Sequence, residues 1–173
     1  MEIKITASIK KLGAKSIEII TAAAEAVGLE RVVVTSTQRP PRAQAEAMLV
    51  NIEENRNIRY KAPGEAVKDV ARKLRGEHKS REEILDAMVA KIREFNAMNP
   101  PKRVSRHCVD DEEYDRLNVI DISFWDMPES KRIPFLAQMV AHKEVTKVIQ
   151  PLDKTIIGHD AGEPALHFEI NQV

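Results

Sequence analysis

Cysteine is almost absent from this 173-residue sequence, which contains a single one, Cys108. One thiol cannot form an intramolecular disulfide, so folding does not depend on an oxidising compartment. It also cannot supply the several thiolates of a typical structural zinc site. A disulfide-stabilised scaffold and a cysteine-rich metal site are therefore both excluded.

An excess of charge of either sign is also missing. Lys and Arg together number 27, Asp and Glu together number 27, and the formal net charge at pH 7 is +0. A protein that binds nucleic acid usually carries a basic excess or a basic patch. We therefore expect no nucleic-acid partner.

Long apolar runs are missing as well. No stretch of the sequence approaches the roughly 20 apolar residues that a membrane-spanning helix needs. Residues 1–13 lack the continuous apolar segment of a secretion signal. We expect a protein with no membrane span that is synthesised in the cytoplasm without a signal peptide.

The residues that are present are typical of a folded globular protein. Hydrophobic residues make up 43% of the chain and charged residues 31%, which differs from the composition of disordered chains. The length suits one domain, and no repeat or Gly/Ser-rich linker marks a boundary. We predict a single domain over residues 1–173 with one hydrophobic core, and we expect a monomer.

Hydrophobic periodicity predicts an α+β fold. Ser80 and Glu83 form a capping-box pattern before the periodic residues 84–98, which predicts a helix there. Other helices are predicted at 16–27, 41–54, 64–75 and 128–142, and strands at 31–36, 103–108, 118–123, 145–151 and 165–170. The N-terminal helices should pack on a small, mostly antiparallel sheet that comes largely from the second half.

Three ionisable residues interrupt the predicted strands: His107, Asp121 and His167. An unpaired charge is costly to bury in an apolar strand, so each of these side chains needs a partner. A shared metal ion would satisfy all three. Two imidazoles and one carboxylate suit Zn²⁺, and three protein ligands leave the fourth position open, as in catalytic zinc sites.

The segments that carry these residues resemble a known family. Ser105 and His107, followed by Asp121 within residues 119–122, are similar to the S-x-H-x-x-G-x-A-x-D motif of the zinc D-Ala-D-Ala carboxypeptidase and hedgehog-type superfamily. Its second histidine comes from a late strand, where residues 165–170 contain His167. The superfamily includes the vancomycin-resistance D-Ala-D-Ala dipeptidases and the L-alanyl-D-glutamate endopeptidases of phage lysins.

A further segment upstream is similar to the same family. Residues 35–39, which end in Arg39 and are followed by Gln44, resemble the family's strand-end S-G-Y-R segment and the glutamine on the next helix. The resemblance implies that Arg39 stabilises the reacting carbonyl, and that Ser105 and Gln44 bind substrate.

Two departures from the family pattern affect the predicted site. Fourteen positions separate His107 from Asp121, more than in the family, so residues 110–117 should form an inserted loop. Asp115 within it is a competing ligand, but its acidic surroundings, including residues 110–113, predict a solvated loop. Asp121 is preferred because its neighbours have strand character.

The second departure concerns the general base. The family commonly places a Glu or Asp three positions before the final histidine, where this chain has Pro164. Glu163 is the nearest substitute, and Glu169 is the next candidate base or a residue that orients a ligand. His159 lies in a Gly-His-Asp turn, where it could line the cleft or be a surface residue. Cys108 follows His107 directly, and adjacent strand residues point to opposite faces, which argues against a Cys–His pair.

The resemblance implies a zinc-dependent peptidase that hydrolyses a peptide bond in peptidoglycan stem peptides. In such an enzyme zinc lowers the pKa of water and polarises the carbonyl, while a carboxylate transfers the proton. Because no secretion signal is seen, we expect action on the cell wall after phage delivery or release by lysis. The alternative is a catalytically weak zinc-binding domain that recognises wall peptides or forms part of a phage or secretion assembly.

Overall fold

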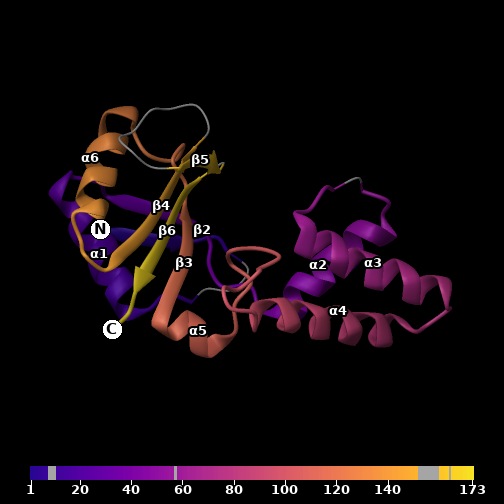
Figure 1. The fold of residues 1–173 in the computed structure, drawn as a ribbon. Coiled ribbons are helices and arrows are strands. Elements are labelled where there is room, and N and C mark those ends of the chain that lie inside the picture. The colour runs from indigo at the N-terminus through magenta and orange to yellow at the C-terminus, as the bar shows by residue number, and fades with distance from the viewer. Residues whose placement is uncertain (8–10, 57, 152–159, 164) are drawn as a thin grey trace. The chain divides into compact units, whose positions relative to one another are not determined.

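A computed structural model describes residues 1–7, 11–56, 58–151, 160–163 and 165–173, without the side chains of 151 and 160–163. The chain divides into two compact units (Figure 1). The sheet unit comprises residues 1–38 and 111–173, and the helical unit comprises residues 39–110. None of the helices described is long and apolar enough to cross a membrane.

The sheet unit is built on a mixed sheet with the strand order β1-β2-β3-β6-β4-β5. The strands are β1 (Glu2–Ile5), β2 (Arg31–Ser36), β3 (Leu117–Ile122), β4 (Val145–Pro151), β5 (Asp160–Glu163) and β6 (Leu166–Asn171). The pairs β1–β2 and β4–β5 are parallel, whereas β2–β3, β3–β6 and β6–β4 are antiparallel. The predicted α+β class is confirmed, and β3 to β6 come from the second half of the chain.

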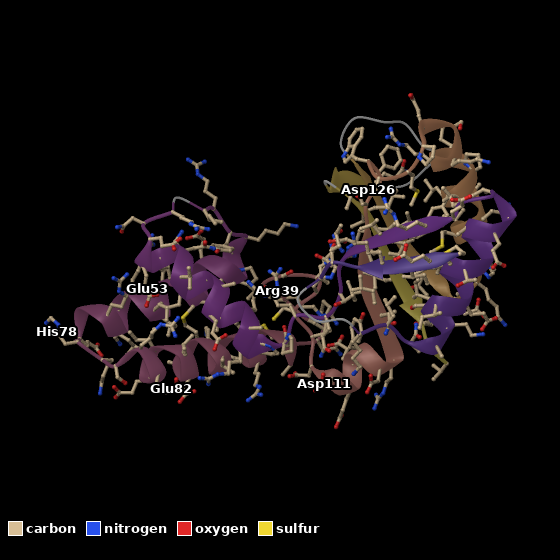
Figure 2. All side chains as sticks on the ribbon, turned by 180° about the vertical axis from the view of Figure 1, so that it is seen from behind. Arg39, Glu53, His78, Glu82, Asp111 and Asp126 are labelled. Carbon is tan, nitrogen blue, oxygen red and sulfur yellow. The ribbon has the colours of Figure 1, made fainter. Side chains whose placement is uncertain are left out.

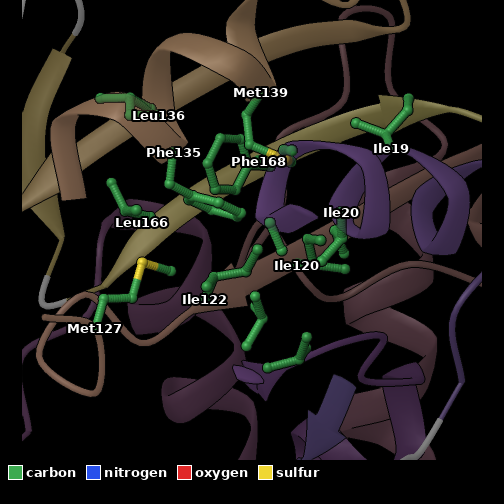
Figure 3. Packing of buried hydrophobic residues seen from close by; sticks show 14 of the residues in the cluster. Ile19, Ile20, Ile120, Ile122, Met127, Phe135, Leu136, Met139, Leu166 and Phe168 are labelled. Atoms are coloured by element: carbon green, nitrogen blue, oxygen red, sulfur yellow. The ribbon is translucent and has the colours of Figure 1, made fainter. Parts of the chain in front are cut away.

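Two helices, α1 (Ala14–Ala26) and α6 (Glu129–Val140), pack on one face of this sheet. Figure 3 shows this core, in which side chains of both helices meet alternate residues of β3 and β6: Ile19, Ile20, Phe135, Met139, Ile120, Ile122, Leu166 and Phe168. Successive strand residues point to opposite faces. Asp121 and His167 therefore point to the face that α1 and α6 do not cover.

The helical unit consists of α2 (Pro41–Glu53), α3 (Ala62–Gly76) and α4 (Arg81–Asn96), together with the segments that join them. Its helices pack on one another around a second buried cluster that includes Met48, Leu49, Leu85, Met88 and Ile92. The prediction of one hydrophobic core is wrong, because the apolar faces of these three helices bury each other. The prediction of a single domain over residues 1–173 stays a prediction.

The N-terminus of α4 has the predicted capping box. The Ser80 hydroxyl accepts a hydrogen bond from the Glu83 backbone N–H, and the Glu83 carboxylate accepts one from the Ser80 N–H. The Ser80 N–H and hydroxyl and the Lys79 ammonium donate to the Glu83 carboxylate, and these hydrogen bonds lower the pKa of Glu83 from 4.5 to about 2. The stability that they contribute is present above the unfolded pKa near 4.5 and is lost as the pH falls toward 2.

Replacing Ser80 with alanine should destabilise the protein by about 1 kcal/mol, because it removes an N-cap hydrogen bond. Ser80→Thr is the matched control and should retain most of the stability, since threonine also caps helices. Urea unfolding followed by circular dichroism measures both variants. Equal losses in the two variants would contradict a capping role for the hydroxyl.

Two local predictions are wrong. Residues 103–108 form a turn instead of a strand: the Cys108 N–H donates to the Ser105 carbonyl and the Val109 N–H to the His107 carbonyl, so local bonds replace a sheet ladder. Residues 110–117 are not a loop, because they include helix α5 (Asp111–Arg116) and the start of β3. Acidic residues in its first turn and Arg116 in its last complement the helix dipole, which stabilises this short helix.

Cys108 is fully buried among the apolar residues of the helical unit. This burial raises the pKa of the thiol to about 12. We expect Cys108 to resist alkylation by iodoacetamide at about pH 8, because the thiolate is the reactive form, and to react fully once the protein is unfolded. Mass spectrometry measures the fraction labelled. Rapid labelling of the folded protein would contradict the buried position.

Candidate metal centre

Two of the predicted ligands face each other across neighbouring strands. Asp121 on β3 and His167 on β6 are partners in the β3–β6 register. His167 Nδ1 lies 2.9 Å from Asp121 Oδ1, which is a hydrogen bond between the two side chains. His167 is 1% exposed, whereas Asp121 is half-buried. Strand pairing therefore fixes one imidazole beside one carboxylate.

Strand β2, on the opposite side of β3 from β6, also contacts the backbone of Asp121. Ser36 on β2 is its register partner at a β2–β3 irregularity, and the Thr35 hydroxyl donates to the Asp121 carbonyl at 3.3 Å. Asp121 thus has neighbouring strands on both sides. A carboxylate in such a position is oriented before any ligand binds, which favours metal binding.

A second carboxylate lies on the same face of β6. Glu169 Oε1 is 3.7 Å from His167 Nε2 and 3.9 Å from Nζ of Lys147 on β4. Burial lowers the pKa of His167, but the hydrogen bonds and charges of Asp121 and Glu169 outweigh it, so the pKa of His167 is raised. A metal ion that binds this imidazole therefore has to displace a proton.

His107 lies with other predicted site residues of the helical unit. The Arg39 backbone N–H donates to the His107 carbonyl at 2.8 Å, and Arg39 Nη1 donates to Gln44 Oε1 at 3.3 Å. Gln44 is buried on α2, and Ser105 belongs to the same turn as His107. Arg39, which Figure 2 labels, is exposed. Residues about 70 positions apart in the sequence are thus neighbours.

His107, Asp121 and His167 form a candidate metal-binding triad, since one ligand atom from each lies within 4.8 Å of the others. Atoms bound about 2.1 Å from a tetrahedral zinc lie about 3.4 Å from one another. The distance of 2.9 Å between His167 Nδ1 and Asp121 Oδ1 is shorter than this, so these two atoms would have to move apart to share one ion. Two imidazoles and one carboxylate are donors that suit a divalent metal ion.

The remaining candidate residues from the sequence do not join the triad in the part of the chain that the structure describes. Asp115 on α5 forms an ion pair with Lys11 at 2.6 Å and is not part of the triad. Glu163 ends β5 opposite Pro151, but its side chain lies outside the part that the structure describes. His159 and Pro164 lie outside the described residues altogether.

One polar residue beside the candidate site was not predicted from the sequence. Lys147 is the register partner of Glu169, so its ammonium lies beside the carboxylate next to His167. Its position in a β-rich run suggests no more than an exposed strand residue. The relevant signal is the pairing of 145–151 with 165–170, which depends on strand order and not on local sequence.

Comparison of the chain with protein-family models, with curated proteins and with solved structures finds no match in any of the three. The assignment of the candidate site therefore rests on the identity and the arrangement of its residues alone.

Proposed function

We propose that this protein is a zinc-dependent peptidase that hydrolyses a peptide bond in peptidoglycan stem peptides, with Zn²⁺ held by His107, Asp121 and His167. The observation that carries the proposal is the grouping of two imidazoles and a carboxylate within 4.8 Å. Three protein ligands leave a coordination position for substrate or water, as in zinc hydrolases.

The roles of the chain's own residues follow from this donor set. A bound Zn²⁺ would polarise the scissile carbonyl and lower the pKa of water. Arg39, exposed and bonded to Gln44, would donate hydrogen bonds to the oxygen on which negative charge develops. Glu163 would transfer the proton to the leaving amine. Glu169, beside His167 and Lys147, would orient the imidazole or replace Glu163 as the base.

The substrate class comes from the resemblance of three segments to the D-Ala-D-Ala carboxypeptidase and hedgehog-type superfamily. These segments contain Arg39, His107 and His167 in the family's order. A cell-wall substrate would be reached by phage delivery or by release on lysis.

The proposal is tested by turnover of purified muropeptides, followed by mass spectrometry of the products. We expect cleavage by the zinc-loaded protein, loss of cleavage with a chelator, and recovery when zinc is restored. Glu163→Ala should reduce the rate strongly, whereas Glu25→Ala, on the exposed side of α1, should not. Zinc and muropeptide binding without any product would refute the peptidase and favour the alternative of a domain that recognises wall peptides.

Arg39→Ala should lower kcat/KM by about 100-fold while leaving zinc content unchanged, because loss of one oxyanion donor costs this much in other hydrolases. Arg42→Ala is the matched control: Arg42 is a nearby exposed arginine, and its ion pairs are with Glu46, Glu82 and Asp86. We expect this control to keep the wild-type rate. Equal activity of the two variants would remove Arg39 from the catalytic machinery.

A further inference from the structure

Although the net charge of the chain is zero, its charges are unevenly distributed, and one segment is strongly basic. Residues 56–81 contain nine Lys or Arg and only three Asp or Glu, although the whole chain has 27 of each class. This segment includes all of α3 and begins near the start of the α2–α3 connection. Positive charge is thus concentrated in one part of the helical unit.

Part of this charge lines a pocket of about 440 Å³ between the end of α2, the α2–α3 connection and α3. The described lining residues include four cations, Arg56, Lys68, Arg72 and Arg75, and no acid. Positions 68, 72 and 75 follow helical i, i+4, i+7 spacing, so these three side chains share one face of α3. We call this pocket the basic pocket.

The four cations differ in how firmly they are held. Lys68 is 11% exposed; it pairs with Glu65 and donates to the Ile58 carbonyl at 3.1 Å, so it has a structural role. Arg56 and Arg72 are 60% and 58% exposed and pair with the neighbouring acids Glu54 and Asp69. Arg56 also donates to Asn51 Oδ1 at 3.5 Å. Exposed ion pairs of this kind contribute little to stability. Both guanidinium groups can therefore turn toward a ligand.

Arg75 connects the basic pocket to a second one. It donates to the Ile52 carbonyl at 3.5 Å and makes no ion pair with a described acid. The second pocket, of about 370 Å³, also contains His78, Lys79 and Arg81, with Glu53 paired to Arg81 at 3.3 Å. Figure 2 labels Glu53 and His78, which mark this end of the helical unit.

We propose that the basic pocket binds a small phosphate-bearing anion through Arg56, Arg72 and Arg75. Planar guanidinium groups match phosphate oxygens in pairs, and several in one pocket favour a ligand with more than one negative charge. The volume is within the range of small-molecule sites.

A single-stranded nucleic acid fits this pocket less well. Such ligands need aromatic rings on which bases stack, and Tyr60 is the aromatic residue among the described lining residues. Lys68 lies 5.6 Å from the centre of its ring. The face of Tyr60 is thus already in contact with a cation.

Isothermal titration of the full chain with inorganic pyrophosphate, at physiological ionic strength, tests the proposal. We expect saturable binding of one equivalent that weakens by about tenfold in Arg72→Gln and in Arg75→Gln, as for the loss of a charge-assisted hydrogen bond. Lys73→Gln is the matched control, since Lys73 is on the same helix but does not line the pocket. It should bind like the wild type.

Parallel titrations with a single-stranded DNA oligonucleotide and with anionic lipid vesicles separate this ligand from other polyanions. Absence of pyrophosphate binding, equal weakening in Lys73→Gln, or tight binding of DNA or vesicles alone would each overturn the proposal. Thermal unfolding of the variants confirms that each remains folded.

Discussion

Alanine in place of His167 should weaken zinc binding by at least about 100-fold, because even outer-shell partners of metal ligands change affinity by about 10–100-fold. The imidazole is 1% exposed and is fixed beside Asp121 by the β3–β6 pairing. Competition with a chromophoric chelator measures the affinity.

Asp121→Ala and His107→Ala should weaken zinc binding to a similar degree, because each removes one of the three proposed ligands. His142→Ala is the control, since His142 follows α6 and is not part of the triad. It should bind zinc like the wild type. Near-wild-type affinity in His167→Ala, or equal weakening in His142→Ala, would refute the assignment.

Phe168→Ala should produce the largest loss of stability in the sheet unit, about 3–5 kcal/mol, because it leaves a cavity in a fully packed core. Phe168 is 0% exposed and lies on β6 between the helix-facing residues Leu166 and Ile170. Guanidinium unfolding followed by circular dichroism measures the change in the free energy of unfolding.

Two further variants serve as comparisons for Phe168→Ala: a second core substitution and an exposed control. Met88→Ala in the core of the helical unit should cost about 2–5 kcal/mol, because Met88 is 0% exposed. Ile17→Ala on the outer side of α1, where Ile17 is 45% exposed, should change stability by less than about 0.5 kcal/mol. If Phe168→Ala costs no more than Ile17→Ala, the described core is not the core of the protein.

Elements with strong local signals are predictable from this sequence. Helix α4 has apolar residues at helical spacing and a capping box at Ser80, and it forms where predicted. Strand β4 has the predicted bounds, because the segment from Val145 to Pro151 is rich in β-branched residues. In both elements local preference and tertiary packing agree.

Elements whose signals are weak or non-local are not predictable in this way. Strand β1 is a short edge strand of four residues with alternating exposure. Its sequence carries a weak strand signal, and the strand is stabilised by its parallel pairing with β2. The turn at residues 103–108 is fixed by bonds such as that from the Arg39 N–H to the His107 carbonyl. A partner so distant in the sequence leaves no local pattern.

The candidate site shows the same division. His107, Asp121 and His167 stand out in the sequence because ionisable residues are costly in apolar segments. The contact between Asp121 and His167 depends on the register of β3 against β6, strands that are not consecutive in the chain. Register follows from the whole sheet, so the contact of Lys147 with Glu169 could not be predicted either.

Anomalous X-ray scattering at the zinc edge, on crystals of the zinc-loaded protein, tests the metal centre most directly. We predict one strong peak within about 2.0–2.2 Å of a nitrogen of His107, an oxygen of Asp121 and a nitrogen of His167. No protein ligand should fill the fourth position. A peak at other residues, or crystals in which His107 is turned away from Asp121 and His167, would contradict the proposed zinc site and the peptidase that depends on it.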